Sequence, residues 1–295
     1  MDKTRTTRHG DVALALPVTV LVLAWASTFA ALKVGLEHCP PVLFAGMRCL
    51  LGAAAMAPAA WRSRVTARRG PSWRTYAVLA GLNVVLFLGL QTLALLHLPS
   101  GTAAVLIYLQ PVLVGLLAWP VLGERLTAAK LGGLLLGFAG VITVSASSLA
   151  ADLPLEGVAA ALLAALAWAL GTVYVKRNED TVTHSGAIAV QFLIGGVVLT
   201  GLGLVVEDPG DISWSPMLWV GLGYAGLVGV ALAWALWFRL IRSGEASRAA
   251  AYIFFVPITA LAIGVVLFGE TLTPSMVVGA LLVVAGIYLV NRRRT

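Results

Sequence analysis

The stretch from Ser100 to Thr127, SGTAAVLIYLQPVLVGLLAWPVLGERLT, returns later in the chain as ASRAAAYIFFVPITALAIGVVLFGETLT, residues 246–273. Six residues in and just after the first stretch recur 146 positions further along. They are Pro111, Gly123, Glu124, Thr127, Gly133 and Gly140, which return as Pro257, Gly269, Glu270, Thr273, Gly279 and Gly286. The chain is therefore predicted to consist of two related five-helix repeats, residues 1–150 and 151–295.

The composition indicates that both halves lie in a membrane. The chain is 60% hydrophobic and 11% charged, whereas a soluble domain carries about 25% charged residues. A helix needs about 20 apolar residues to cross the bilayer core. Ten stretches of that kind fit the chain, at 12–33, 41–60, 75–96, 101–121, 129–147, 155–175, 185–205, 217–238, 248–268 and 275–291.

Five crossings in each half determine the predicted fold class. Because five is odd, the second half must enter the membrane from the side opposite to the first. We therefore expect an all-α membrane protein of ten transmembrane helices, arranged as two inverted five-helix repeats. Repeats of this kind are typical of transporters, in which the two halves can open a central site alternately to either side.

The basic residues predict the orientation of the chain. If the N-terminus is cytoplasmic, every Lys and Arg except Lys33 and Arg48 falls on the cytoplasmic side, as the positive-inside rule requires. The net charge of +7 is then a topology signal rather than a sign of nucleic-acid binding. We expect a multi-pass protein of the bacterial inner membrane with both termini cytoplasmic. Its expected partners are the lipid bilayer and a small-molecule substrate, and it is expected to be a monomer or a weak dimer.

Polar and aromatic side chains within the predicted spans are the candidate substrate site, because polar groups in hydrocarbon usually face a cavity or another helix. A spacing of four places Asn83, Phe87 and Gln91 on one helix face, and an interhelical hydrogen bond is the alternative. Mid-span tryptophans could stack on a flat solute or pack against lipid instead. The residues expected to line the cavity are Trp25, Asn83, Phe87, Gln91, Tyr108, Trp168, Tyr224, Tyr252 and Phe255.

Two prolines lie in the middle of predicted spans. Pro111 and Pro257 each remove a backbone donor, which leaves the carbonyls of Ile107 and Ile253 without helical partners. A kink is predicted in each helix. Broken helix centres can supply backbone acceptors or act as hinges, whereas a kink satisfied by neighbouring helices is the alternative. We expect both prolines to take part in hinge motion or gating.

The charged residues at the helix ends have both structural and functional interpretations. Lys33 and Arg48 are expected near the outer mouth, where they could attract a carboxylate, although snorkelling or pairing with Glu37 explains them equally well. Glu124 and Glu270 occupy repeat-equivalent turns and are interpreted as structural.

Several classes of function lack their sequence patterns. A Walker-type phosphate loop is absent, the four histidines show no zinc-ligand spacing, and no serine or cysteine has a plausible base. An enzyme is therefore not expected, and no catalytic residue, metal site or cofactor is predicted. None of the 13 acidic residues lies deep in a predicted helix. Because proton-coupled carriers usually rely on an intramembrane carboxylate, we predict facilitated export down a concentration gradient.

The chain resembles the drug/metabolite transporter superfamily, specifically its ten-helix EamA-type exporters. The resemblance rests on residues 25–33, on Arg48 and on the two stretches 100–127 and 246–274, and it covers nearly the whole chain. It implies a central cavity lined by helices 1, 3, 4, 6, 8 and 9, with helices 5 and 10 set aside as a packing pair. The aromatic-rich helices are similar to those of the aromatic amino-acid exporters.

The sequence therefore predicts a secondary transporter that exports amino acids, aromatic ones among them, or similar small amphipathic metabolites by alternating access. The alternative within transporters is a multidrug or cation efflux protein, which would need an anionic or aromatic cage. A membrane-embedded enzyme is the less favoured alternative, because it would require clustered acidic or histidine residues at one membrane face.

Overall fold

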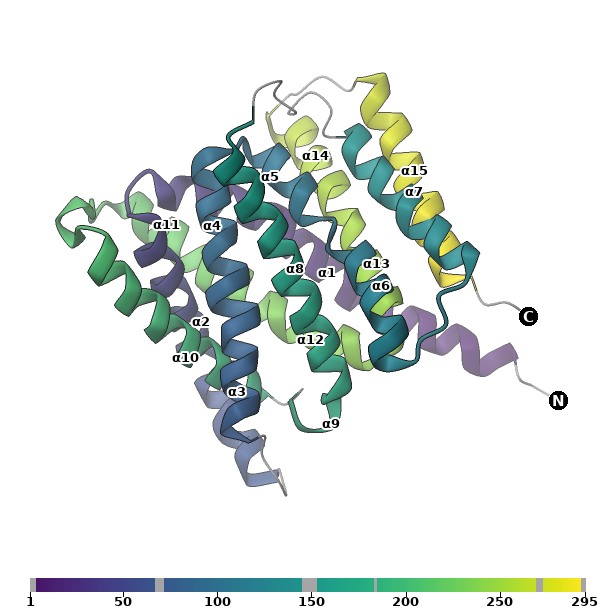
Figure 1. The fold of residues 1–295 in the computed structure, drawn as a ribbon, viewed down its shortest axis with the longest axis horizontal. Coiled ribbons are helices and arrows are strands. Elements are labelled where there is room, and N and C mark those ends of the chain that lie inside the picture. Colours follow the sequence, from purple (N-terminus) through teal and green to yellow (C-terminus); the bar gives the residue numbers. More distant parts are fainter. Residues whose placement is uncertain (1–3, 67–71, 145–152, 183–184, 269–272, 293–295) are drawn as a thin grey trace.

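The computed structural model describes residues 4–66, 72–144, 153–182, 185–268 and 273–292. Within these ranges the chain forms helices and no strand. Among the described residues, eight helices are long and apolar enough to cross a membrane, and two shorter apolar helices cover 128–144 and 246–260. Figure 1 shows them as one bundle of steeply inclined helices. The predicted all-α fold with ten apolar helices is confirmed.

The first half contains five spans, two of which are composite. Its elements are α1 (Thr4–Leu36), α2 (Pro41–Thr66), α3 (Trp73–Leu79), the π-helical η1 (Ala80–Leu86), α4 (Phe87–His97), α5 (Ser100–Ile107), α6 (Gln110–Leu122) and α7 (Ala128–Val144). Thus α3, η1 and α4 together make the third span, and α5 and α6 make the fourth.

The second half repeats this order. Its elements are α8 (Leu155–Arg177), the short α9 (Glu179–Val182), α10 (Ser185–Val206), the 3-10 turn η3 (Pro209–Asp211), α11 (Pro216–Tyr224), the π-helical η4 (Ala225–Leu232), α12 (Ala233–Arg242), α13 (Ala246–Ala251), the 3-10 turn η5 (Tyr252–Phe254), α14 (Phe255–Phe268) and α15 (Pro274–Asn291). A π-helical segment therefore lies in the middle of both the third and the eighth spans. Such segments occur frequently at functional sites.

The α-helix is interrupted just ahead of each of the two mid-span prolines, where kinks were predicted. In the fourth span α5 ends at Ile107, and α6 begins with Pro111 in its first turn. In the ninth span the helix changes to a 3-10 turn just before Pro257. Proline has no backbone N–H and its ring clashes with the preceding turn, so each helix is interrupted ahead of it. That these interruptions act as hinges stays a prediction.

Two glycine-lined helix pairs flank the centre of the bundle. Figure 1 shows α7 beside α15 at one edge and α2 near α10 at the other. A Cβ atom on Gly140 would lie 2.7 Å from the carbonyl oxygen of Gly279, and one on Gly203 would lie 2.8 Å from the side chain of Leu43. Small residues let helix backbones approach closely in a membrane. The remaining spans lie between these two pairs and surround the centre.

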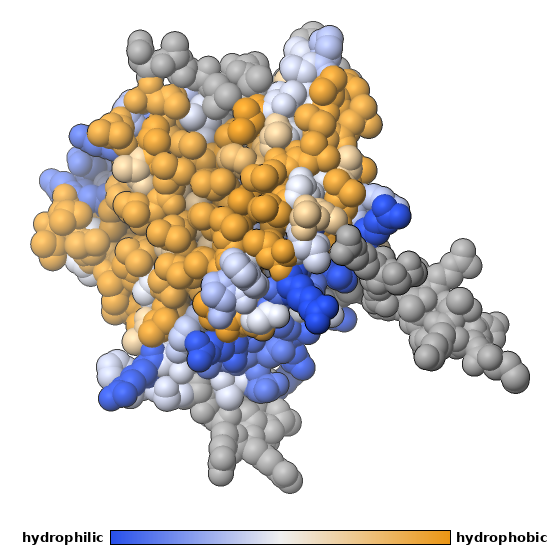
Figure 2. All heavy atoms as spheres, turned by 45° about the vertical axis from the view of Figure 1, so that its right-hand side comes forward, coloured by the Kyte–Doolittle hydropathy of each residue, from blue (hydrophilic) through white to orange (hydrophobic). Residues whose placement is uncertain are grey.

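The charged residues gather at the ends of the bundle. Figure 2 shows a broad apolar surface with hydrophilic residues concentrated toward its lower edge. Consecutive spans run in opposite directions, so the C-terminal ends of α2, α8 and α12 lie at the same end of the bundle. We call this the basic end, because it carries Arg62, Arg177 and Arg242.

At the opposite end Glu207, which follows α10, caps the N-terminus of α2. Its carboxylate oxygens accept hydrogen bonds from the backbone N–H groups of Val42 and Leu43, each at 2.8 Å. An anion is stabilising at a helix N-terminus, where the first N–H groups lack helical partners. Burial, and then the charge of Glu207, raises the pKa of the nearby Cys39 thiol to about 11. This thiol is therefore protonated at neutral pH.

Candidate functional site

A cluster of aromatic rings occupies the centre of the bundle. Trp25 of α1 lies edge-on to Trp168 of α8, with ring centroids 5.3 Å apart. Phe87 of α4 stacks on Trp168, with ring centroids 4.6 Å apart and an angle of 17° between the ring planes. Trp234 and Trp237 of α12 complete the cluster, at 6.4 and 5.7 Å from Trp25. Such arrangements match the preferred edge-to-face and offset geometries of aromatic pairs. Four separate spans therefore meet through their rings.

A small cavity lies against this cluster. It is bounded by rings of Trp25, Phe87 and Trp168 and by the polar side chains of Arg48 and Gln91. Its volume is about 30 Å³, which suits one or two water molecules. This cavity is smaller than a metabolite, and its lining differs from the one that the resemblance implies, because Arg48 of the second span takes part and no described residue of the ninth span does. In this conformation a solute can enter only if the lining helices move apart.

The structure brings five of the nine predicted lining residues to this cavity. They are Trp25, Phe87, Gln91, Tyr108 and Trp168. That these residues bind substrate stays a prediction.

The other four predicted residues lie elsewhere. Asn83 is buried and donates a hydrogen bond from Nδ2 to Oε1 of Gln191 at 3.1 Å. The Tyr224 hydroxyl lies 2.7 Å from the Ser27 hydroxyl, and its side chain is 38% exposed. Tyr252 and Phe255 are half-buried at the interruption of the ninth span.

Arg48 lies deeper than its expected position near the outer mouth. It is seven residues beyond Pro41, the first residue of α2, and therefore about 10 Å into the helix. The side chain is only 2% exposed. Its Nη2 donates to the carbonyl oxygen of Leu88, to Oε1 of Gln91 and to Oγ1 of Thr92, at 3.2 to 3.3 Å. The sequence signal for this location is that Arg48 falls inside an apolar span, where a charge is usually functional.

Two buried polar pairs join the halves of the protein. Besides the bond between Asn83 and Gln191, Nε2 of Gln110 on α6 donates to Oγ1 of Thr172 on α8 at 3.1 Å. Hydrogen bonds of this kind connect helices in membranes. Gln110, Thr172 and Gln191 were not singled out from the sequence, because each partner comes from the other half and no spacing reveals it.

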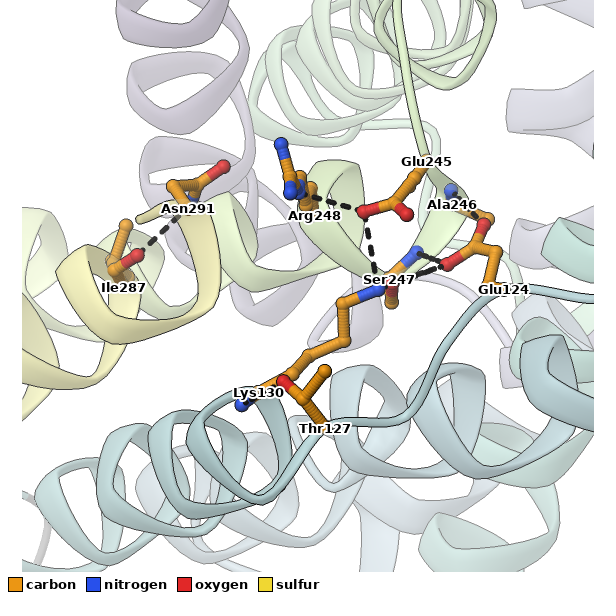
Figure 3. A network of polar contacts seen from close by, with 9 residues as sticks. All are labelled: Glu124, Thr127, Lys130, Glu245, Ala246, Ser247, Arg248, Ile287 and Asn291. Atoms are coloured by element: carbon orange, nitrogen blue, oxygen red, sulfur yellow. Dashed lines mark hydrogen bonds and ion pairs between the residues drawn. The ribbon is translucent and has the colours of Figure 1, made fainter. Parts of the chain in front are cut away.

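A second polar cluster closes the basic end, and Figure 3 shows it. Glu124, after α6, accepts hydrogen bonds from the N–H groups of Ala246 and Ser247 at 2.6 and 3.3 Å, and from the Ser247 hydroxyl. Lys130 of α7 lies 3.1 Å from a carboxylate oxygen of Glu245 and 3.6 Å from one of Glu124. We call these five residues the basic-end network. Their contacts tie α6 and α7 to the start of the ninth span, consistent with the structural role predicted for Glu124.

The model of the EamA-like transporter family matches residues 14–146 and again 155–292. The uncharacterized transporter YvbV of Bacillus subtilis is 38% identical, over 95% of this chain and 92% of its own length. A probable amino-acid metabolite efflux pump of Salmonella typhimurium is 29% identical over 92% of each chain. A crystal structure of a protein with 21% identity has a TM-score of 0.81, covering 95% of this chain and 96% of its own, and so shares the fold.

Proposed function

The chain belongs to the EamA-like transporter family, and we propose that it exports amino acids, aromatic ones among them, or similar small amphipathic metabolites. It is a multi-pass membrane protein related to proteins named as transporters. The observation that carries the substrate class is the wall of rings formed by Trp25, Phe87 and Trp168 beside the amide of Gln91. Mostly apolar walls with a few polar groups are typical of sites for small molecules. Two relatives named as probable amino-acid metabolite efflux pumps support the proposal.

We place the protein in a bacterial inner membrane with the basic end toward the cytoplasm. Arginines at the ends of α2, α8 and α12 support this orientation, because short cytoplasmic segments are enriched in Lys and Arg. Both termini are then cytoplasmic. The N-terminus of α2, capped by Glu207, faces the outside.

Transport proceeds in this proposal by alternating access. The two halves share their interruptions, with η1 matching η4 and the break after α5 matching η5. Each half can therefore adopt the conformation of the other, which moves the opening from one side to the other. In the conformation observed, α6 packs against α13 at the basic end. The basic-end network then serves as the cytoplasmic gate, and it must separate for the cavity to open inward.

Removing the charge of Glu124 tests the gate. Glu124→Gln retains the side-chain shape but weakens the cap on Ala246 and Ser247 and removes one partner of Lys130. Charge-assisted hydrogen bonds contribute about 1.5–3 kcal/mol, so we expect the basic end to open about tenfold more often. The measurement is the rate of thiol labelling of Cys placed at the buried Ala249, in a chain whose native cysteines are replaced by alanine.

Glu179→Gln is the matched control for this gate. Glu179 forms its ion pair with Lys176, also at the basic end, but outside the contact between α6 and α13. This variant should label at the parental rate. Equal labelling rates for Glu124→Gln and the parent would show that the basic-end network is not a gate.

Counterflow in proteoliposomes tests the transport function itself. The panel of labelled amino acids consists of phenylalanine, tryptophan, leucine, threonine and cysteine. For at least one of them, vesicles loaded with the same unlabelled amino acid should take up label several-fold faster than empty vesicles. Uptake of flat organic cations, without uptake of any amino acid, would support the multidrug alternative instead.

Glu156, in the first turn of α8, is the only acidic residue within the ten described spans. We therefore expect no accumulation driven by a pH step, and such accumulation would contradict facilitated export.

A further inference from the structure

A buried positive charge that has no negative partner in the described part of the chain lies beside the central cavity. Arg48 is 2% exposed and contributes to the cavity wall. None of the ion pairs among the described residues includes Arg48; they involve Lys130, Lys176 and Arg248. A buried charge is normally paired, because removing it from water without compensation is costly.

The hydrogen bonds of Arg48 leave part of its donor capacity unused. All three go through Nη2 to neutral acceptors, and Nε has no acceptor among the described residues. A guanidinium offers five N–H donors in a planar fork that matches a carboxylate. A purely structural link between α2 and α4 accounts for the bonds to Leu88, Gln91 and Thr92. It does not account for the unfilled Nε or for the missing negative charge.

A second buried donor on the same cavity also lacks a partner. The indole Nε1 of Trp168 has no acceptor among the described residues, although the side chain is only 2% exposed. Buried indole N–H groups usually find a hydrogen-bond partner. Arg48 and Trp168 both line the cavity, and neither Nε of Arg48 nor Nε1 of Trp168 has an acceptor among the described residues. The group that would complete this site is therefore rich in acceptors and negatively charged.

We propose that Arg48, assisted by the indole N–H of Trp168, binds a carboxylate group of the transported solute. This inference rests on the proposed function and narrows it, because it makes a carboxylate a requirement for recognition. The rings of Trp25 and Phe87 then hold the apolar part of the same molecule. A solute that carries only a positive charge is excluded, since it would meet a buried cation and, among the described residues, no carboxylate in the cavity wall.

The wild-type protein allows the first test, with matched ligands that differ in one group. Thermal stability of the purified protein is measured with phenylalanine, phenylalaninamide, phenethylamine and 3-phenylpropanoate, and with the same series built on leucine. We expect the carboxylates to stabilise the protein and to bind about 10- to 100-fold more tightly than the amide or the amine. Equal binding of amide and carboxylate would overturn the inference.

Variants of Arg48 give the second test. Arg48→Gln should reduce the preference for carboxylate over amide to near unity, whereas Arg48→Lys keeps the charge and should retain part of it. Arg239→Gln, an exposed arginine near the basic end, is the control and should keep the full preference. If Arg48→Gln fails to fold, the comparison of Arg48→Lys with the wild type still decides, because an unchanged preference in that variant contradicts fork-like recognition.

The outcomes separate this inference from the proposed function. Binding of 3-phenylpropanoate without binding of any amino acid would sink the amino-acid function and leave the role of Arg48 standing. Equal binding of an amino acid and its amide would contradict the role of Arg48 but would remain compatible with the proposed function. Absence of binding by every carboxylate in the panel would contradict both. An arm with chloride alone identifies an inorganic anion as the partner if chloride displaces the carboxylates, and this would overturn the assignment.

Discussion

Replacing Gly286 by valine should prevent α7 and α15 from packing and should lower the yield of folded protein to a small fraction of the wild type. A Cβ atom on Gly286 would lie 2.5 Å from the backbone nitrogen of Gly137 and 2.6 Å from the carbonyl oxygen of Gly133. Both atoms belong to the α7 backbone, which cannot turn aside as a flexible side chain can. Overpacking typically costs about 1–3 kcal/mol of stability. Because Gly286→Val requires a helix backbone to move, we expect its cost to lie at or above the upper end of that range.

The separation would extend beyond the site of the substitution. Helices in lipid associate mainly through close van der Waals packing, so pushing α7 and α15 apart at Gly286 also weakens the contact between Gly140 and Gly279. Size-exclusion chromatography and thermal unfolding in detergent give the measurement. Gly132→Val is the matched control, because Gly132 lies on the exposed side of α7 and an added Cβ would meet nothing within 4 Å. Similar yields of folded protein for the two variants would contradict the close packing of α7 against α15 described above.

This helix pair also shows how far the sequence could predict the fold. The repeat related Gly133 to Gly279 and Gly140 to Gly286, and the resemblance implied that helices 5 and 10 pair. In the structure Gly133 meets Gly286, and Gly140 meets Gly279. Each glycine therefore contacts the repeat equivalent of its neighbour rather than its own. Two antiparallel helices related by a two-fold axis form contacts in this exchanged order. The constant offset between the repeats does not by itself reveal which glycines meet.

The site was less predictable because it depends on the rotation and depth of each side chain. A spacing of four placed Asn83 on the same face as Phe87 and Gln91, and this holds only for a regular α-helix. Asn83 lies in the π-helical η1, whereas Phe87 and Gln91 lie in α4. The wider turn of a π-helix rotates Asn83 away from the cavity and toward Gln191 on α10. Nothing in the local sequence marks this change of helix type.

The contacts that bury Arg48 could not be predicted for a related reason, although its place inside an apolar span is visible in the sequence. The expected position near the outer mouth assumed that the charge would reach toward water. In the structure its partners are the backbone of Leu88 and the side chains of Gln91 and Thr92. Only the packing of α2 against α4 brings these acceptors to the guanidinium, so the burial follows from tertiary structure.

Replacing Trp168 by alanine should nearly abolish exchange of aromatic amino acids. Trp168 is 2% exposed and contacts the rings of Trp25, Phe87 and Trp237. Truncating a buried tryptophan costs about 3–5 kcal/mol of stability, and it also removes the stacking surface and the indole donor of the proposed site. We expect counterflow of phenylalanine, normalised to the amount of reconstituted protein, to fall at least about tenfold. Trp119→Ala, at a tryptophan that is 61% exposed, should transport like the wild type.

Trp168→Phe separates the two roles of this side chain. Phenylalanine can still stack on Phe87 and approach Trp25, so folding and the maximal rate should change little. It lacks the N–H group, so the KM for carboxylate solutes should rise about 3- to 10-fold, in line with a net contribution of about 0.5–1.5 kcal/mol for one hydrogen bond. A variant with unchanged KM would show that the indole N–H does not contact the solute. Unchanged exchange in Trp168→Ala would contradict the whole proposed site, because the solute would then cross the bundle without contacting the centre of the ring cluster.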